Sequence, residues 1–392
     1  MSIISAPTRF GHMNADHAPG QQQDALPPGL RHVDFSHGDV DAFPPPPSVL
    51  EAVAGALNDG GRYAYSPYRG HSFIRELLAP RLSEFTNTSV DPTTEMIITP
   101  GTQGGLFLAL SSLVDTGDKV AIVAPDYFAN RKIVEYLQAE PVPVSLGYLT
   151  SESGRACLDL DRLEEVFSQG VRLLVFSNPN NPTGVIYSAD DIEAIARLAE
   201  KYNAFVIVDE LYSRQIFDGI GFTHLRAYTA QRCLTLLGPS KTESVSGCRV
   251  GVAIGPAPVI QRMEQLQGIV SLRAPGYMQA ALEPWFVEPD GWLDQRIEDH
   301  ARIRDDMHAV FMDSGYVRTR RTEGGSYLFL HVPAADGKID EFVERLRSEA
   351  AVTVTRGQEF GNFQDAVRLN FSQDHGAAVD AARRITDMAA KF

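Results

Sequence analysis

Short apolar runs and amphipathic segments alternate along the chain between residues 95 and 255. The runs are rich in Val, Ile and Leu, and the segments between them carry apolar residues at helical spacing. This alternation is typical of βα units and predicts an α/β fold with a mainly parallel sheet flanked by helices. The expected strands are 96–99, 120–124, 173–176, 205–208, 235–237 and 250–254.

The segment between the third and fourth of these strands has a clear signal for the start of a helix. Ser188 can cap it, Asp191 follows three residues later, and apolar residues then recur at helical spacing. An earlier helix is expected at 48–57, where Pro44 to Pro47 form a stiff entry and Val49, Val53 and Leu57 share one face.

The pattern changes after about residue 285. A long amphipathic helix is expected at 292–312, then a strand at 327–332 and a helix at 339–347. These elements predict a second, smaller α+β domain. The expected organisation is a mobile N-terminal arm at 1–30, a large domain at 48–285, and a small domain formed by 31–47 together with 286–392.

Composition and charge exclude several classes of protein. The formal charge of −15, from 35 basic and 50 acidic residues, opposes binding to nucleic acid. The apolar runs are too short to span a membrane, and the N-terminus lacks the layout of a signal peptide. Cys157, Cys233 and Cys248 form neither a metal pattern nor a disulfide framework. We therefore expect a soluble cytoplasmic protein without a membrane partner or a structural metal.

Polar residues that could take part in catalysis or ligand binding follow two consecutive strands. Asp209 ends an apolar, β-branched run, and Asn178–Gly184 is a loop with two Asn-Pro pairs directly after the preceding strand. The carboxyl ends of parallel strands open onto one edge of the sheet, where open α/β folds bind their ligands. Each segment alone has an ordinary alternative, a capping or loop aspartate and a rigid turn without chemistry.

Two cations stand where a cation is unusual. Lys241 lies in a loop of small polar residues after an apolar strand, although a lone lysine is most often a solvated surface charge. Arg368 lies inside the apolar stretch 367–372, where a guanidinium is costly unless it meets an anion. A substrate carboxylate would supply that anion, and a structural salt bridge is the alternative.

With these segments in order, the chain resembles the class I/II aminotransferases, the aspartate aminotransferase-like family of fold-type I enzymes dependent on pyridoxal 5'-phosphate. The resemblance runs from about Val33 to the C-terminus. It departs from the common pattern at Gly238, where a serine is frequent, and at Arg356-Gly357, where a Pro-Gly pair is frequent.

The resemblance implies the residues that hold the cofactor. Lys241 would form the Schiff base and move the substrate proton, and Asp209 would keep the pyridine nitrogen protonated. Asn181 and Tyr212 would hydrogen-bond the phenolic oxygen, with Tyr212 also in the catalytic group, and Tyr127 would stack on the ring. The residues implied around the phosphate are Thr102, Gln103, Ser240 and Arg249.

The resemblance also implies how substrate and subunits are arranged. Arg368, Asn181 and Gly38 would bind the substrate carboxylate, and Tyr65 would reach the phosphate of a neighbouring subunit, which requires a homodimer with shared active sites. Arg273 lies on a loop that reaches the mouth of the site in relatives. It suggests a substrate with an acidic side chain, unless it pairs with Asp39 or Asp41.

The expected reaction is ping-pong transamination between an L-amino acid and a 2-oxo acid through a Lys241 aldimine. The same fold and cofactor also support β-elimination, ring-forming elimination or amine oxidation, and the sequence leaves these alternatives open. A transcriptional regulator built on this scaffold would need a DNA-binding domain, for which the N-terminal arm is too short and insufficiently basic.

Overall fold

The computed structural model describes residues 27, 29–149 and 156–392. The predicted arm at 1–30 lies almost entirely outside the described residues. Among those that are described, no helix is both long and apolar enough to cross a membrane.

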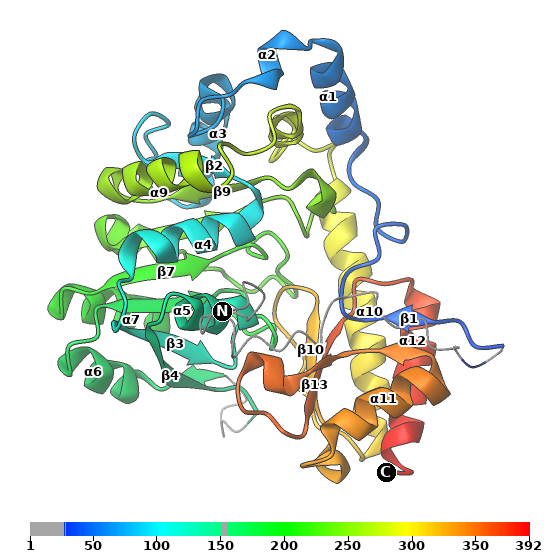
Figure 1. Cartoon of the computed structure of the whole chain (residues 1–392). Helices are drawn as coiled ribbons and strands as arrows, with labels where there is room; N and C mark the ends of the chain where they lie inside the picture. Colours follow the sequence, from blue (N-terminus) through cyan, green and yellow to red (C-terminus); the bar gives the residue numbers. More distant parts are fainter. Residues whose placement is uncertain (1–26, 28, 150–155) are drawn as a thin grey trace, which may run out of the picture.

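An eight-stranded sheet forms the centre of the larger part of the chain (Figure 1). Its strands, in spatial order, are β2 (Met96–Thr99), β9 (Gly251–Ile254), β8 (Cys233–Leu237), β7 (Phe205–Asp209), β6 (Leu173–Ser177), β3 (Lys119–Ala124), β4 (Glu140–Gly147) and β5 (Cys157–Leu158). Strands β8, β7, β6, β3 and β4 are parallel, whereas β9 is antiparallel to both of its neighbours and β5 to β4. The predicted fold class and all six predicted strands are confirmed.

Strand β4 escaped prediction because Pro141 and Pro143 interrupt its apolar pattern. A proline cannot donate a hydrogen bond to a neighbouring strand, so it is tolerated mainly at an edge. Here β5 pairs with β4 only at Leu146 and Gly147, which leaves the segment with the two prolines open on that side.

Helices cover both faces of the sheet. Alternate residues of β3 point to opposite sides, with Val120 and Ile122 in one hydrophobic cluster and Ala121 and Val123 in the other. The first face packs against α4 (Gly101–Leu113), α5 (Phe128–Tyr136) and α9 (Ala257–Val270), and the second against α6 (Leu160–Ser168) and α7 (Ala189–Lys201). The predicted capping box of α7 is present, because Ser188 and Asp191 exchange hydrogen bonds.

The remaining helices of this part lie near the edge formed by β2. They are α1 (Pro47–Asn58), α2 (Gly61–Ala64), α3 (Ser72–Phe85) and α8 (Arg226–Thr229). The structure also contains 3-10 turns at Ala230–Arg232, Ser246–Cys248, Tyr277–Leu282, Pro333–Ala335 and Gly357–Phe360.

A second α+β unit follows, as the sequence predicts. Its antiparallel sheet is β10 (Tyr327–His331), β13 (Ala366–Asn370) and β12 (Thr355–Arg356), and β1 (Val33–Asp34) pairs in parallel with β11 (Val352–Thr353). The helices α10 (Trp292–Ser314), α11 (Ile339–Ala350) and α12 (His375–Ala389) share its hydrophobic core. The pairing of β1 with β11 ties the segment after residue 31 to this unit, beside α12 (Figure 1).

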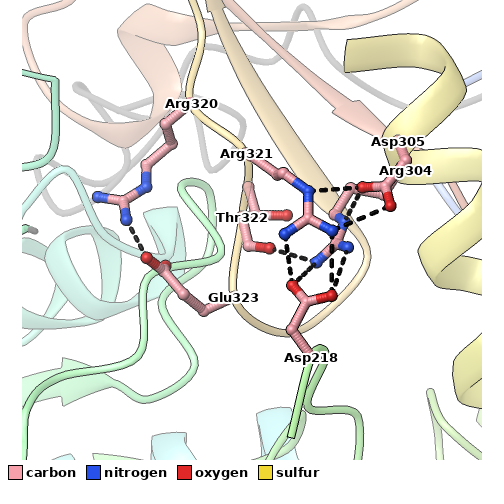
Figure 2. Close-up of polar contacts among 7 residues, drawn as sticks. All are labelled: Asp218, Arg304, Asp305, Arg320, Arg321, Thr322 and Glu323. Carbon is pink, nitrogen blue, oxygen red and sulfur yellow. Dashed lines mark hydrogen bonds and ion pairs between the residues drawn. The ribbon is translucent and has the colours of Figure 1, made fainter. Parts of the chain in front are cut away.

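Four charged side chains form a closed ring where α10 meets two loops of the chain (Figure 2). Asp218, after β7, accepts paired hydrogen bonds from Arg304 (2.9 and 3.1 Å) and from Arg321 (2.6 and 3.0 Å). Asp305 accepts a bond of 2.8 Å from the Nε of each of these arginines. The side chain of Arg304 is 0% exposed, so its charge depends on these carboxylates.

We predict that Asp218→Asn lowers the free energy of unfolding by about 1–3 kcal/mol, because it weakens charge-assisted hydrogen bonds to a buried arginine. The bonds from Arg304 hold the pKa of Asp218 below its usual value. The stabilisation is therefore complete above the unfolded pKa of about 4 and is lost as the pH falls through the lower folded value. Denaturant unfolding at pH 7 and at pH 3 measures both effects, and an equal loss at the two pH values would contradict the assignment.

Candidate active site

One cavity of about 360 Å³ collects the predicted residues. It lies at the carboxyl edge of the parallel strands, where β7 ends at Asp209 and β6 ends at Ser177, its partner in register. The cavity is lined by Thr102, Gln103, Tyr127, Asn181, Asp209, Tyr212, Ser240, Lys241, Arg249 and Arg368. The structure thus brings together every predicted cofactor residue except Tyr65, and the predicted carboxylate-binding arginine.

A second hollow of about 510 Å³ opens beside this cavity. Tyr212, Ser240 and Lys241 line both, and Gly38 lines only the second. The backbone of the Gly38 segment lies close to the second α+β unit, because a Cβ placed on Gly38 would stand 3.4 Å from the side chain of Ser372. Lys241 therefore lies between two openings of one site.

Asp209 and Lys241 form the electrostatic pair of the cavity. The enclosure of Asp209 raises its pKa to about 6, while a hydrogen bond from the Leu211 N–H (3.0 Å) and the charge of Lys241 act in the opposite direction. Within the described part of the chain, the Lys241 amine makes no direct hydrogen bond or close salt bridge, and its interaction with Asp209 acts through space. The amine is therefore not committed to a structural contact.

The start of α4 forms a cradle for an anion. Gly101 has a φ of +75°, and a Cβ there would stand 2.6 Å from Nη2 of Arg249. A Cβ on Gly251 would likewise stand 2.6 Å from the backbone nitrogen of Thr102. These glycines let a guanidinium and a strand approach the positive end of a helix, a combination that suits a phosphate group.

Two further details of the cradle fit a phosphate. The Ser240 hydroxyl is buried and has no hydrogen-bond partner among the described residues, so an acceptor or donor is missing from its surroundings. At Gly238, where relatives often have serine, a Cβ would stand 3.2 Å from Cγ2 of Thr102. A side chain at this position would press on the start of α4, and Ser240 is the serine of this loop that lines the cavity beside Thr102.

Tyr127 is fixed in the cavity wall by a hydrogen bond of 2.8 Å from its hydroxyl to Gln103 Oε1. Its ring lies 4.6 Å from that of Phe128, and burial raises its pKa above the usual range. Tyr127 therefore presents a neutral aromatic ring to the cavity. Stacking of that ring on a cofactor stays a prediction.

Arg368 is buried on β13 with neutral partners. Its Nη1 donates to Asn181 Oδ1 (3.1 Å), and its Nη2 donates to the Ser36 carbonyl (3.0 Å) and to Thr355 Oγ1 (3.3 Å). Its guanidinium carbon also lies 4.5 Å from the ring centre of Tyr327. Among the described residues it makes no ion pair with a carboxylate, so the structural salt bridge considered from the sequence does not form there.

Tyr327 and Ser36 also line the cavity and were not predicted from the sequence. The hydroxyl groups of Tyr327 and Tyr212 lie 2.5 Å apart, and burial raises the pKa of Tyr212 well above its usual value. Tyr327 could have been found by pairing β10 with β13. In that pairing Tyr327 lies opposite Asn370, and both side chains are on the face of the sheet that carries Arg368. Ser36 contributes through its backbone carbonyl, which leaves no trace in the sequence.

Tyr65 and Arg273 lie outside the cavity of their own chain. Tyr65 is 83% exposed, and the Arg273 guanidinium lies 5.5 Å from its ring centre. Arg273 donates to the Ser66 carbonyl (2.7 Å), so its partner is neither Asp39 nor Asp41. In the part of the chain that the structure covers, no three His, Cys, Asp or Glu side chains are grouped to hold a metal ion.

The structure places a lysine, an acid and a glycine-rich helix start with an arginine at one edge of a mainly parallel sheet. The chain belongs to the class I and II aminotransferase family, whose model matches residues 32–385. It is accordingly an aminotransferase, and the family depends on pyridoxal phosphate. The resemblance inferred from the sequence motifs is confirmed.

Individual relatives agree on the fold and differ in their named substrates. A crystal structure described as an aspartate aminotransferase from Rhodobacter sphaeroides 2.4.1 is 52% identical, with a TM-score of 0.91 over 94% of this chain and 96% of that chain. An aspartate aminotransferase of Sulfolobus acidocaldarius is 27% identical and covers 92% of this chain and 90% of its own. An arginine–pyruvate transaminase of Pseudomonas aeruginosa is also 27% identical, covering 91% and 90%.

We predict that Gly101→Ala weakens the binding of pyridoxal phosphate to the cofactor-free protein by roughly tenfold to a hundredfold, the equivalent of one charge-assisted contact. The added methyl group would displace the Arg249 guanidinium. Gly219→Ala is the matched control, since Gly219 also has a positive φ (+65°) but no atom within 4 Å of its Cβ position. Equal affinities for the two variants, measured by absorbance titration, would contradict the cradle.

Proposed function

We propose that this aminotransferase holds pyridoxal phosphate at Lys241 and moves an amino group between an L-amino acid and a 2-oxo acid in two half-reactions. The observation that carries the proposal is the presence of Lys241, Asp209 and Arg368 in one cavity, with Arg368 lacking any acidic partner among the described residues. A buried guanidinium with only neutral contacts is suited to a carboxylate that arrives with the substrate.

The residues of the cavity match the chemical groups of the cofactor. The Lys241 amine would hold its aldehyde carbon, Asp209 its ring nitrogen, and the cradle of Thr102, Ser240 and Arg249 its phosphate. Tyr212 and Asn181 would donate to its phenolic oxygen. When bound, the cofactor supplies an electron-withdrawing ring that accepts the electrons released at the substrate Cα.

Proton transfer falls to Lys241. Once the substrate amine has replaced it, the free amine would be the base that takes the proton from the substrate Cα and delivers it to the carbon that carried the cofactor aldehyde. Asp209, enclosed and with its pKa raised to about 6, is ionised at neutral pH and would hold a proton on the ring nitrogen as a close ion pair.

The substrate carboxylate would be oriented by Arg368, with Asn181 and the Gly38 backbone beside it. Arg368 is itself oriented by the Ser36 carbonyl and Thr355, which fixes the direction of its fork of donors. The aromatic rings of Tyr327 and Phe360 lie 4.5 and 4.9 Å from its guanidinium and exclude water from it. A fixed, poorly hydrated guanidinium binds a two-oxygen anion with defined geometry.

We further propose a homodimer with shared sites and a substrate that has an acidic side chain. Among the described residues, the lysines and arginines lining the 360 Å³ cavity are Lys241, Arg249 and Arg368, and each already has a proposed role. Arg31 lines the second hollow and is paired with Asp374 at 3.1 Å. A second carboxylate therefore needs a cation from elsewhere, and Arg273 stands on the surface against the exposed Tyr65. The relative that is 52% identical is described as an aspartate aminotransferase, which supports this choice of substrate.

The surface near Arg273 is suited to a second copy of the chain. At and just after the end of α9, Ile269 is 82% exposed, Val270 is 59% exposed and Leu272 is 47% exposed. Large apolar side chains gathered on one region of a soluble protein favour an association that covers them. A twofold contact there would bring Tyr65 and Arg273 of each chain toward the other chain's cavity.

We predict that Lys241→Ala abolishes transamination, with a loss of at least 10²–10⁴-fold, the usual worth of one positioned proton-transfer group. Borohydride treatment of the wild type with pyridoxal phosphate should place the covalent label on residue 241. Lys119→Ala is the control and should keep full activity, because Lys119 is the first residue of β3, at the end away from the cavity, and its side chain is 56% exposed. A label elsewhere, or ammonia released without any need for a 2-oxo acid, would contradict the proposed reaction.

We predict that Arg273→Ala raises the KM for aspartate and glutamate by about 10–100-fold, the loss of one charge-assisted contact, and leaves the KM for alanine unchanged. Arg262→Ala on α9 is the control, because Arg262 contacts only the Ser112 carbonyl (3.4 Å). Absorbance titrations of the cofactor with each amino acid give the same comparison. Unchanged spectra on addition of aspartate or glutamate to the wild type would rule out the acidic substrate.

A further inference from the structure

Asp126 is a buried carboxylate between two of the strand ends that form the cavity. It follows β3 and is 3% exposed. One of its oxygens accepts hydrogen bonds from the Tyr127 N–H (2.6 Å), the Ser177 hydroxyl (2.6 Å) and the Asn130 amide (3.2 Å). The other accepts from the Ser177 N–H (2.9 Å) and the Asn180 amide (3.2 Å).

All the partners of this carboxylate are donors, and none of the described ones is a cation. A carboxylate removed from water is stable only if hydrogen bonds replace its hydration. Here the replacement comes from the start of α5 and from the loop after β6. The orientation of both segments therefore depends on the same two oxygen atoms.

The contacts lead directly to residues of the cavity. On one side Asp126 holds the backbone of Tyr127, whose hydroxyl reaches Gln103. On the other side the Ser177 hydroxyl, which donates to Asp126, accepts the Asn181 N–H at 3.0 Å. Asn181 in turn accepts the hydrogen bond from Arg368. The Asp126 carboxylate thus connects Tyr127, on one side of the cavity, with Asn181, on the side proposed to bind the substrate carboxylate.

We propose that Asp126 is a positioning residue for the transamination site, holding Tyr127 and Asn181 at the distance that the cofactor ring requires. The proposal rests on the function proposed above, because both residues act only on a bound cofactor and substrate. Asparagine cannot replace it, since an amide would turn an N–H₂ group toward a set of donors. A buried donor facing donors costs more than a missing bond, so the two segments would move apart.

A purely structural role is the competing explanation, and cofactor binding separates the two. The proposal predicts that Asp126→Asn weakens pyridoxal phosphate binding by at least about tenfold, shifts the absorption band of the bound cofactor and lowers kcat, because buried hydrogen bonds to both segments are lost. Asp218→Asn is the control, since it removes a carboxylate with several donors that lies outside the cavity. It should lower the Tm of the cofactor-free protein and leave cofactor affinity and absorption unchanged.

A double-mutant cycle with Ser177→Ala tests the route to Asn181. Because Asp126 reaches Asn181 through the Ser177 hydroxyl, the two losses overlap, and the double variant should lose cofactor affinity within about twofold of Asp126→Asn alone. If Asp126→Asn does not fold, Ser177→Ala alone decides, and it should weaken cofactor binding at least threefold with a Tm near that of the wild type.

Cofactor affinity and kcat within twofold of the wild type in Asp126→Asn, additive losses in the cycle, or unchanged affinity in Ser177→Ala would overturn the positioning role. The proposed function would survive each of these results. A wild-type protein that takes up no pyridoxal phosphate would instead remove both, so the two failures are distinguishable.

Discussion

The parallel pairing of β6 with β7 is the contact on which the site depends. Ser177 and Asp209 are partners in register, and the Asn178 N–H donates to the Asp209 carbonyl at 2.9 Å just beyond the last pair. Asn181 and Asp209 are 28 positions apart in the sequence. The loop with Asn181 and the carboxylate of Asp209 nevertheless meet, because both strands end at the same edge of the sheet. A shift of one residue in this register would turn Asp209 to the opposite face of the sheet.

The two buried arginines Arg304 and Arg368 differ in the partners that compensate their charge. Arg304 and Arg368 are both buried, but Arg304 is neutralised by Asp218 and Asp305, whereas the described partners of Arg368 are neutral. A compensated arginine contributes to the joint between α10 and its neighbouring loops. Arg368 also lines the cavity, so in the proposed function its guanidinium is available to a substrate carboxylate.

The sequence was sufficient to predict site residues where a reactive side chain follows a recognisable strand. Asp209 and Lys241 could be placed because each stands at the end of an apolar strand, and a strand end fixes the edge that a side chain faces. Tyr327 and Asp126 could not be placed, because their partners lie far along the chain and the contacts depend on packing. The same reason applies to Arg273, whose observed partner is the Ser66 carbonyl rather than an acidic side chain.

In the proposed function, the type of reaction and the choice of substrate depend on different parts of the molecule. Lys241, Asp209 and the cradle at Gly101 come from the interior edge of one sheet, where a substitution disturbs several packed segments at once. Tyr65 and Arg273 lie on the surface, where side chains can change at little cost to the core. The proposed function thus assigns the reaction to the sheet edge and the choice of substrate to Arg273, and it is compatible with relatives named for aspartate and for arginine.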